Sequence, residues 1–194
     1  MTTGQAGDQG ECFISVDVET GGATPADYAL LSIGACLVDD PETTFYVELK
    51  PEDKRSTQEA LEVSKLSLDI LETMGEPPAE AMQRFADWVG EVVPRGQRAV
   101  FVGFNAAFDW MFVADYFERY VGRNPFGYTA LDIKAFAMGR LGGSWSDTSM
   151  SVLSPKYLSG RPLAHHALGD AQDQAALFRA LRDEPVHPAR EEQP

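Results

Sequence analysis

The stretch CFISVDVET, residues 12–20, is a short apolar run that ends in two acids, and it decides the fold more than any other part of the chain. A run of this length and composition favours a β-strand. Side chains two residues apart in a strand point to the same face of the sheet, so Asp17 and Glu19 project together while Val18 turns to the other side. The sequence therefore predicts a strand whose end carries two adjacent carboxylates.

These two carboxylates are a candidate metal site, although acid pairs at strand ends are common. Two adjacent like charges repel, which favours protonation of each, and a divalent cation removes that penalty. Oxygen ligands suit Mg²⁺ or Mn²⁺. Taken alone, Asp17 and Glu19 are explained equally well as a solvated strand end, so the assignment depends on the rest of the chain.

Outward from this strand, the apolar pattern predicts an α/β fold. Apolar runs bounded by turn residues predict strands at 12–18, 29–38, 45–49, 99–104 and 129–131. Helical spacing predicts helices at 58–64, 78–93, 107–121, 132–141 and 168–181, with a polar loop at 142–149. Three strands with short connections, followed by alternating helices and strands, indicate a mixed sheet flanked by helices, with an antiparallel meander first and parallel strands after.

A third acid, Asp109, ends the segment FNAAFD at residues 104–109. This segment follows a predicted buried strand and opens a helix, so Asp109 falls in the first helical turn. Ligand sites in α/β sheets tend to lie at such carboxyl ends of strands. An ordinary first-turn acid, favoured by the helix dipole, explains Asp109 at least as well.

A histidine and a fourth acid stand in HHALGD, residues 165–170. The spacing can place His165 on a loop and Asp170 on the helix that follows. A neutral imidazole near pH 7 can accept a proton from water, which makes His165 a candidate general base. A histidine pair on a surface loop is the simpler explanation for His166.

The order of the three motifs resembles the histidine branch of the DEDD exonuclease superfamily. DVET at 17–20, NAAFD at 105–109 and the Hx4D segment at 165–170 match its signature over most of the chain. The closest resemblance is to ribonuclease T, and oligoribonuclease and the proofreading subunit of bacterial DNA polymerase III share the motifs. Further segments similar to ribonuclease T are LLSIGA at 30–35, RNPF at 123–126 and LD at 131–132. The resemblance implies a ribonuclease H-like fold and 3′→5′ exonuclease activity.

The resemblance also implies a role for each site residue. Asp17 would bridge two Mg²⁺ or Mn²⁺ ions per active site. Glu19 and Asp170 would complete the tighter ion site, and Asp109 would hold the second ion. His165 would deprotonate the attacking water, and nucleoside 5′-monophosphates would leave one at a time from a free 3′-OH. The residues expected to contact the terminal nucleotide are Thr20, Glu59, Asn105 and Phe108. The same resemblance favours a homodimer.

The sequence departs from ribonuclease T at positions that would contact the substrate. Its aromatic residues that wedge between the terminal bases correspond here to Ala23, just after DVET, and to Val63, just after QEAL at 58–61. Tyr128 is a candidate for a third such ring. Each base–aromatic stack is worth ~1–3 kcal/mol, so fewer rings weaken the grip on the terminal nucleotide. The base preference of ribonuclease T is therefore not carried over to this chain.

The net charge excludes a protein that coats long nucleic acid. Lys plus Arg number 16 against 30 Asp plus Glu, which gives a net charge of −14, whereas phosphate binding rests on cationic side chains. A nuclease that grips a few terminal nucleotides through metal ions is compatible with this charge. We expect short or single-stranded RNA or DNA ends as substrates, and the choice of sugar stays open because contacts to the 2′-OH decide it. Most of the cations considered near the site are expected to be ordinary surface charges; these cations are Lys50, Lys54, Arg55, Lys156 and Arg161.

The whole chain of 194 residues fits a single exonuclease domain at 11–182 with flexible tails at 1–10 and 183–194. Cys12 and Cys36 are expected to be reduced, no signal peptide is recognisable and no apolar stretch reaches membrane-spanning length, so the expected location is the cytoplasm. The alternative function is a proofreading-type or accessory nucleic-acid-binding module on the same fold, acting with a polymerase or other partner. The presence of all the motif acids and the histidine favours the enzyme.

Overall fold

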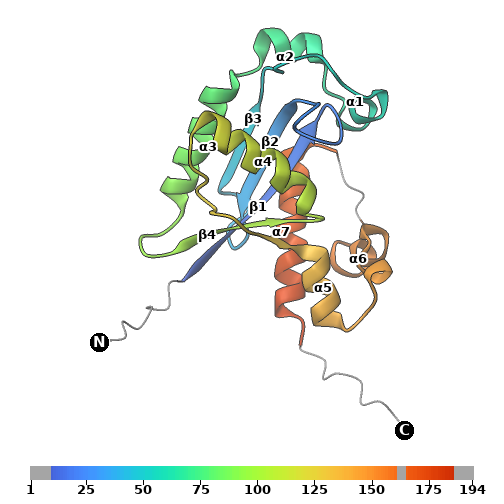
Figure 1. Ribbon diagram of the computed structural model, residues 1–194. Coiled ribbons are helices and arrows are strands. Elements are labelled where there is room, and N and C mark those ends of the chain that lie inside the picture. Colours follow the sequence, from blue (N-terminus) through green and yellow to red (C-terminus); the bar gives the residue numbers. More distant parts are fainter. Residues whose placement is uncertain (1–9, 161–164, 186–194) are drawn as a thin grey trace.

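Within residues 10–160 and 165–185, which the computed structural model of the protein describes, a five-stranded mixed sheet forms the centre of the molecule (Figure 1). The strand order is β3-β2-β1-β4-β5. β1, β2 and β3 are antiparallel neighbours, while β4 and β5 continue the sheet in parallel with β1. The predicted meander followed by parallel strands is confirmed. The strands are β1 (Glu11–Thr20), β2 (Leu30–Leu37), β3 (Thr44–Glu48), β4 (Arg98–Gly103) and β5 (Ala130–Asp132).

Helices cover both faces of this sheet. One apolar core lies between the sheet and α3 with α4, and the second lies between the sheet and α5, α6 and α7. A smaller apolar cluster joins α1 and α2, the helices at the top of Figure 1, to the start of β2. The helices are α1 (Gln58–Ser64), α2 (Leu68–Met74), α3 (Pro78–Val92), α4 (Ala107–Tyr120), α5 (Ile133–Leu141), α6 (Met150–Tyr157) and α7 (Ala167–Asp183), with a 3-10 turn η1 (Trp145–Thr148).

The alternation along β1 decides which face carries the acids. Ile14, Val16 and Val18 are buried in the core beneath α3 and α4. The residues between them face the other way, toward α7, which packs on β1 and β2. Asp17 and Glu19 therefore share the face of the sheet that α7 covers.

Two helical segments were missing from the sequence prediction. α2 has only seven residues and leaves Ile70 and Met74 exposed, so its apolar pattern is weak; a hydrogen bond from the Ile70 N–H to the Ser67 hydroxyl begins it. η1 lies inside the segment 142–149, which is predicted as a loop, and α6 follows that segment directly; Pro155 inside α6 argues against a helix in the sequence. Packing of Leu153 in the second core stabilises α6 despite the proline.

The last helix extends slightly beyond its predicted end. α7 continues to Asp183, one residue into the predicted C-terminal tail, and most of both predicted tails lies outside the described residues. Among the described helices, none has the length and apolar character needed to cross a membrane.

Candidate active site

Three carboxylates predicted from the sequence meet at the carboxyl end of β1. Asp17 and Glu19 come from β1, and Asp170 comes from the first turn of α7. One ligand oxygen from each of the three lies within 4.8 Å of the others. Asp170 is buried, and the two strand acids are partly buried. Because hard divalent cations prefer oxygen ligands, this group fits the predicted metal site.

The close approach of α7 to the sheet brings Asp170 to the two strand acids. Gly34 of β2 lies directly opposite Asp17 in the antiparallel register. A Cβ atom at this position would overlap the backbone of Ala167 and Leu168 in the first turn of α7. The absence of a side chain at Gly34 therefore lets the helix N-terminus lie against β2, where its acid can reach Asp17.

Asp109 lies close to this group but outside the three-acid cluster. It is buried in the first turn of α4, and its Oδ1 accepts a hydrogen bond of 3.1 Å from the backbone N–H of Val18. Its charge is among those that raise the pKa of Asp17. The sequence correctly placed Asp109 at the first helical turn after β4, beside the strand that carries the other acids.

Gln174 is a site residue that the sequence analysis missed. It is 3% exposed, and its Nε2 donates a hydrogen bond of 2.5 Å to Asp17 Oδ1. Its Oε1 accepts a hydrogen bond of 2.9 Å from the Phe104 backbone N–H, which fixes the orientation of the amide. One feature of the sequence points to Gln174 as a site residue. It stands four residues after Asp170, and residues at that spacing share one helix face.

Burial and mutual repulsion make the metal-free site costly to ionise. Desolvation is the main cause for each acid: it raises the pKa of Glu19 to about 7, with Asp170 adding to the effect, and the pKa of Asp109 to about 8. The pKa of Asp17 is raised well above its ordinary value by desolvation and by Asp109, Asp170 and Glu19. A bound dication would compensate these charges, so the electrostatics fit a metal site.

Without metal, folding stability is expected to fall as the pH rises. The ordinary pKa of Glu19 is 4.5 and that of Asp109 is 3.8, so between these values and about 7 and 8 the folded chain binds protons that the unfolded chain has released. This contribution is fully present below the ordinary pKa values and is lost as the pH rises through the folded ones. Thermal melts in EDTA should give a lower Tm at about pH 8 than at about pH 5.

Added Mn²⁺ or Mg²⁺ should raise the Tm more at the higher pH, because binding is coupled to release of the extra protons. Glu19→Gln is the control, since it should flatten the pH dependence in EDTA and weaken the response to metal. A Tm in EDTA that is constant or rises over this pH range would contradict the expectation.

A cavity of 420 Å³ lies beside the carboxylates and gathers most of the predicted substrate-binding residues. Thr20, Glu59 and Phe108 line it together with Ala23 and Val63, and Glu19 forms part of the wall that faces the acids. The Thr20 hydroxyl donates a hydrogen bond of 2.7 Å to the Gly22 carbonyl, which fixes the turn after β1. The cavity therefore has one aromatic wall, Phe108, and two aliphatic positions where ribonuclease T would have rings.

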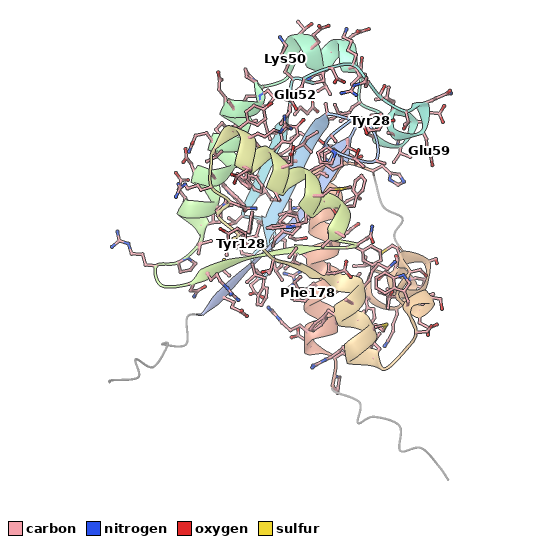
Figure 2. The ribbon with its side chains drawn as sticks, viewed as in Figure 1. Tyr28, Lys50, Glu52, Glu59, Tyr128 and Phe178 are labelled. Atoms are coloured by element: carbon pink, nitrogen blue, oxygen red, sulfur yellow. The ribbon has the colours of Figure 1, made fainter. Side chains whose placement is uncertain are left out.

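Asn105 and Tyr128 are not among the residues that line this cavity. Asn105 is exposed and has a left-handed backbone conformation, with a φ of 61°. Tyr128 is 97% exposed and lines a separate cavity with Trp110 and Arg123. Figure 2 shows Tyr128 well away from Glu59, which lies at the α1 end of the molecule near Tyr28. Tyr128 does not supply the third ring at this cavity.

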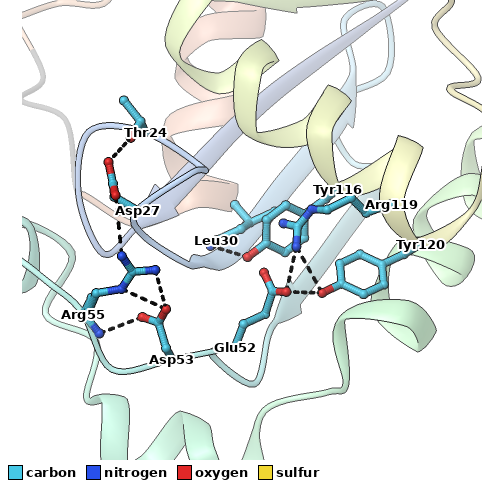
Figure 3. A network of polar contacts seen from close by, with 9 residues as sticks. All are labelled: Thr24, Asp27, Leu30, Glu52, Asp53, Arg55, Tyr116, Arg119 and Tyr120. Atoms are coloured by element: carbon cyan, nitrogen blue, oxygen red, sulfur yellow. Dashed lines mark hydrogen bonds and ion pairs between the residues drawn. The ribbon is translucent and has the colours of Figure 1, made fainter.

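Ion pairs hold the loops around the cavity (Figure 3). Arg55, which precedes α1, pairs with Asp53 at 2.8 Å and with Asp27 of the loop after β1 at 3.5 Å. Glu52 accepts a hydrogen bond of 2.7 Å from Arg119 of α4. Single exposed pairs contribute little, but together these contacts connect the cavity loops to α4.

His165 lies on the connection that leads into α7. It is exposed and has a φ of 52°, a conformation that residues other than glycine adopt seldom. Residues 161–164 before it lie outside the described part of the chain. The neighbouring His166 stacks on Tyr46 of β3, with ring centroids 4.8 Å apart, so this ring is a packing contact. The structure thus separates the two histidines, and His165 is the one without that stacking contact.

The fold and the cluster of acids are those expected of a 3′→5′ exonuclease, and comparisons with known proteins show this class. The family model described as "3'-5' exoribonuclease Rv2179c-like domain" matches residues 12–182, and the chain belongs to this family. The protein named 3'-5' DNA exonuclease Cap18, from Escherichia coli, is 44% identical over 171 residues, which cover 88% of this chain and 91% of that protein. The 3′→5′ exonuclease class that the resemblance implied is confirmed.

Solved structures share the fold at low sequence identity. The nuclease domain of 3'hExo, a DEDDh family member solved with rAMP, has a TM-score of 0.69 and 14% identity, and the match covers 97% of this chain and 100% of that one. Pop2p of S. pombe, in a Mg²⁺- and Mn²⁺-bound form, has a TM-score of 0.63 and 16% identity over 88% of this chain and 82% of that one. The predicted ribonuclease H-like α/β fold is confirmed.

Proposed function

We propose that this exonuclease releases nucleoside 5′-monophosphates from the 3′ ends of short or single-stranded nucleic acid and that it depends on two Mg²⁺ or Mn²⁺ ions. The observation that carries the proposal is the cluster of Asp17, Glu19 and Asp170, whose ligand oxygens lie within 4.8 Å of one another beside a cavity of 420 Å³. Burial raises the pKa of Asp17 and of Glu19, and closely spaced acids with a raised pKa next to a cavity are typical of functional sites.

We assign each acid its own role in metal binding. Asp17 would bridge the two ions, Glu19 and Asp170 would complete one site, and Asp109 would serve the other. Bound ions of this kind stabilise both the attacking and the leaving oxygen of an in-line displacement. Gln174 holds Asp17 in position through its 2.5 Å hydrogen bond. His165, on its exposed connection, would take the proton of the attacking water.

The terminal nucleoside would occupy the cavity beside the acids. Phe108 offers a ring for its base, and Thr20 and Glu59 offer oxygen acceptors. Ala23 and Val63 leave room where larger rings would clamp a particular base, so we propose weak base selectivity. The family description names an exoribonuclease and the relative from Escherichia coli is named a DNA exonuclease, so RNA and DNA are both candidate substrates.

Digestion of matched RNA and DNA oligonucleotides tests the proposal. Each short single strand carries a 5′ label and is incubated with Mg²⁺, with Mn²⁺ or with EDTA. We expect a ladder that shortens from the 3′ end with either metal and none in EDTA, with nucleoside 5′-monophosphates as the products. Equal hydrolysis in EDTA would refute the metal dependence. Failure to digest either nucleic acid with either metal, in a folded sample, would refute the proposed substrate class.

The oligomeric state is proposed on the resemblance alone. Ribonuclease T and oligoribonuclease act as dimers, and we propose the same for this chain. We expect light scattering coupled to size-exclusion chromatography to give the mass of a dimer. A monomeric mass at the concentrations used in the digestion would exclude dimer formation as a requirement for activity.

A further inference from the structure

An exposed tryptophan and a lysine lie together outside the cavity lined by Phe108 and Glu59. Trp145 in η1 is 51% exposed. The Nζ of Lys134, in the first turn of α5, lies 4.2 Å from the centroid of the Trp145 ring and 5.7 Å from that of Phe104. Phe104 follows β4 and is partly buried. The three side chains form a surface of two rings and one cation, which we call the Lys134–Trp145 surface.

The η1 turn that presents Trp145 is well ordered by local hydrogen bonds. Asp147 accepts hydrogen bonds from the backbone N–H and the hydroxyl of Ser144, at 2.9 and 2.7 Å. The Thr148 hydroxyl donates a hydrogen bond of 2.7 Å to the Trp145 carbonyl. η1 also packs against α5, which carries the lysine. The tryptophan is therefore held on the surface by its own turn and does not depend on a bound partner for its position.

The Lys134–Trp145 surface is connected to the metal-binding acids by a short series of contacts. Phe104 donates its backbone N–H to Gln174, and the same amide donates to Asp17. Glu19, which belongs to the same cluster as Asp17, lines the cavity proposed for the terminal nucleoside. The acids are thus connected by direct contacts both to that cavity and to the Lys134–Trp145 surface. A scissile phosphate held at the acids, with its terminal nucleoside in the cavity, would direct the preceding nucleotide toward Trp145.

Lys134 also differs from most of the cations considered near the site. Lys54 pairs with Asp69 and Glu72, and Arg55 pairs with Asp53. Lys156 pairs with Glu184, and Arg161 lies outside the described residues.

In the part of the chain that the structure describes, by contrast, no carboxylate lies within 4.0 Å of the Lys134 ammonium, whose contacts are the two rings. In a chain of net charge −14, a cation without an acid partner beside the acidic site is suited to a substrate phosphate.

We propose that the Lys134–Trp145 surface binds the nucleotide that precedes the scissile phosphate, with Lys134 on its phosphate and its base on the exposed part of the Trp145 ring. This inference rests on the proposed function and extends it to the strand upstream of the cut. Stacking on an indole requires an unpaired base, so the surface selects single-stranded ends. A lysine ammonium contacts phosphate as a point charge, without regard to the base.

The test compares two substrates that differ only in what precedes the scissile phosphate. The p-nitrophenyl ester of thymidine 5′-monophosphate has a nucleoside for the cavity and no upstream nucleotide, and its hydrolysis releases p-nitrophenol and thymidine 5′-monophosphate. A short oligothymidylate adds the upstream strand. For Trp145→Ala and Lys134→Ala we expect the KM for the oligonucleotide to rise about tenfold with little change in kcat. Both variants should hydrolyse the ester at the same rate as the protein without substitutions.

Matched variants separate a binding role from a structural one. Trp145→Phe and Lys134→Arg keep a ring and a charge and should restore most of the affinity. Tyr128→Ala removes another exposed ring, one that lines a different cavity, and should leave both substrates unaffected. An unchanged KM for the oligonucleotide in Trp145→Ala and Lys134→Ala would overturn the inference, and so would an equal loss on both substrates.

If the proposed function is wrong, the protein without substitutions hydrolyses neither substrate. This result is distinct from failure of the inference about the Lys134–Trp145 surface, in which that protein is active. A measurement of oligonucleotide binding still tests the inference when neither substrate is hydrolysed. The anisotropy of a labelled oligothymidylate in Ca²⁺ should report at least several-fold weaker binding by Trp145→Ala than by Tyr128→Ala. Equal binding by these two variants would overturn it.

Discussion

Asp17→Asn is expected to lower the rate of oligonucleotide hydrolysis by about 10³-fold while the chain stays folded. Asp17 is the acid that interacts electrostatically with all the others: it shares the 4.8 Å cluster with Glu19 and Asp170, and the charge of Asp109 raises its pKa. The amide has nearly the same shape but no charge, so it would weaken both ion sites. Its Oδ1 can still accept the hydrogen bond from Gln174, which keeps the local packing.

The same substitution gives a second readout that does not depend on activity. Removing one of four repelling carboxylates should raise the Tm in EDTA at about pH 8, and the increase in Tm produced by Mn²⁺ should become small. Loss of activity together with a lower Tm in EDTA would mean that Asp17 is needed for folding. Near-normal hydrolysis would show that Asp17 does not bind the catalytic metal.

His165→Ala provides a useful contrast in the same assay. A general base contributes typically 10²–10⁴-fold, so we expect a loss of about 10²-fold with metal binding intact. Because hydroxide can replace the missing base, the activity of His165→Ala should rise with pH, whereas that of Asp17→Asn should stay low at every pH. The response of the Tm to Mn²⁺ should also be normal in His165→Ala.

The sequence predicted the sheet and the acids because both depend on local patterns. The strand β1 is defined by a short apolar run, and the period of two that makes it a strand also places Asp17 and Glu19 on one face. The placement of Asp109 follows from a buried strand that runs into a helix. These features are properties of contiguous segments and can be predicted without knowledge of distant contacts.

Features that depend on distant contacts could not be predicted in this way. Gln174 reaches Asp17 across 157 positions and Phe104 across 70 positions of the chain. Lys134 and Trp145 are separated in sequence by the rest of α5 and a short loop, and nothing in that loop indicates that η1 turns back onto α5. The ion-pair partners of the cations considered from the sequence could not be predicted for the same reason, since the acids that pair with Lys54 and Arg55 are recognisable only in the folded chain.

Gly34→Ala is expected to lower activity by at least about 10²-fold although residue 34 touches neither metal nor substrate. The added Cβ would overlap the backbone of Ala167 and Leu168, and a helix backbone cannot move aside as the end of a flexible side chain can. The N-terminus of α7 must therefore shift away from β2 by about an ångström. Asp170 shifts with it, and a misplacement of this size is enough to cost about 10²-fold in rate.

The cost in stability should be smaller than the cost in activity. Overpacking of a well-filled contact typically costs ~1–3 kcal/mol, which would leave most of the protein folded at room temperature. Thermal melts and oligonucleotide hydrolysis on the same sample separate the two effects. The Mn²⁺-induced increase in Tm should also shrink, because the acid of α7 no longer meets the two acids of β1.

Gly90→Ala is the matched control for this substitution. Gly90 lies in α3, and a Cβ atom added there would meet nothing within 4 Å. Alanine is favoured over glycine inside a helix by roughly 0.5–1 kcal/mol, so Gly90→Ala should leave activity unchanged and raise the Tm slightly. Normal activity in Gly34→Ala would show that α7 can shift without moving Asp170 out of reach of Asp17. The close contact between β2 and α7 would then contribute to packing alone, and the position of Asp170 would have to depend on other contacts of α7, such as those of Gln174 with Asp17 and Phe104.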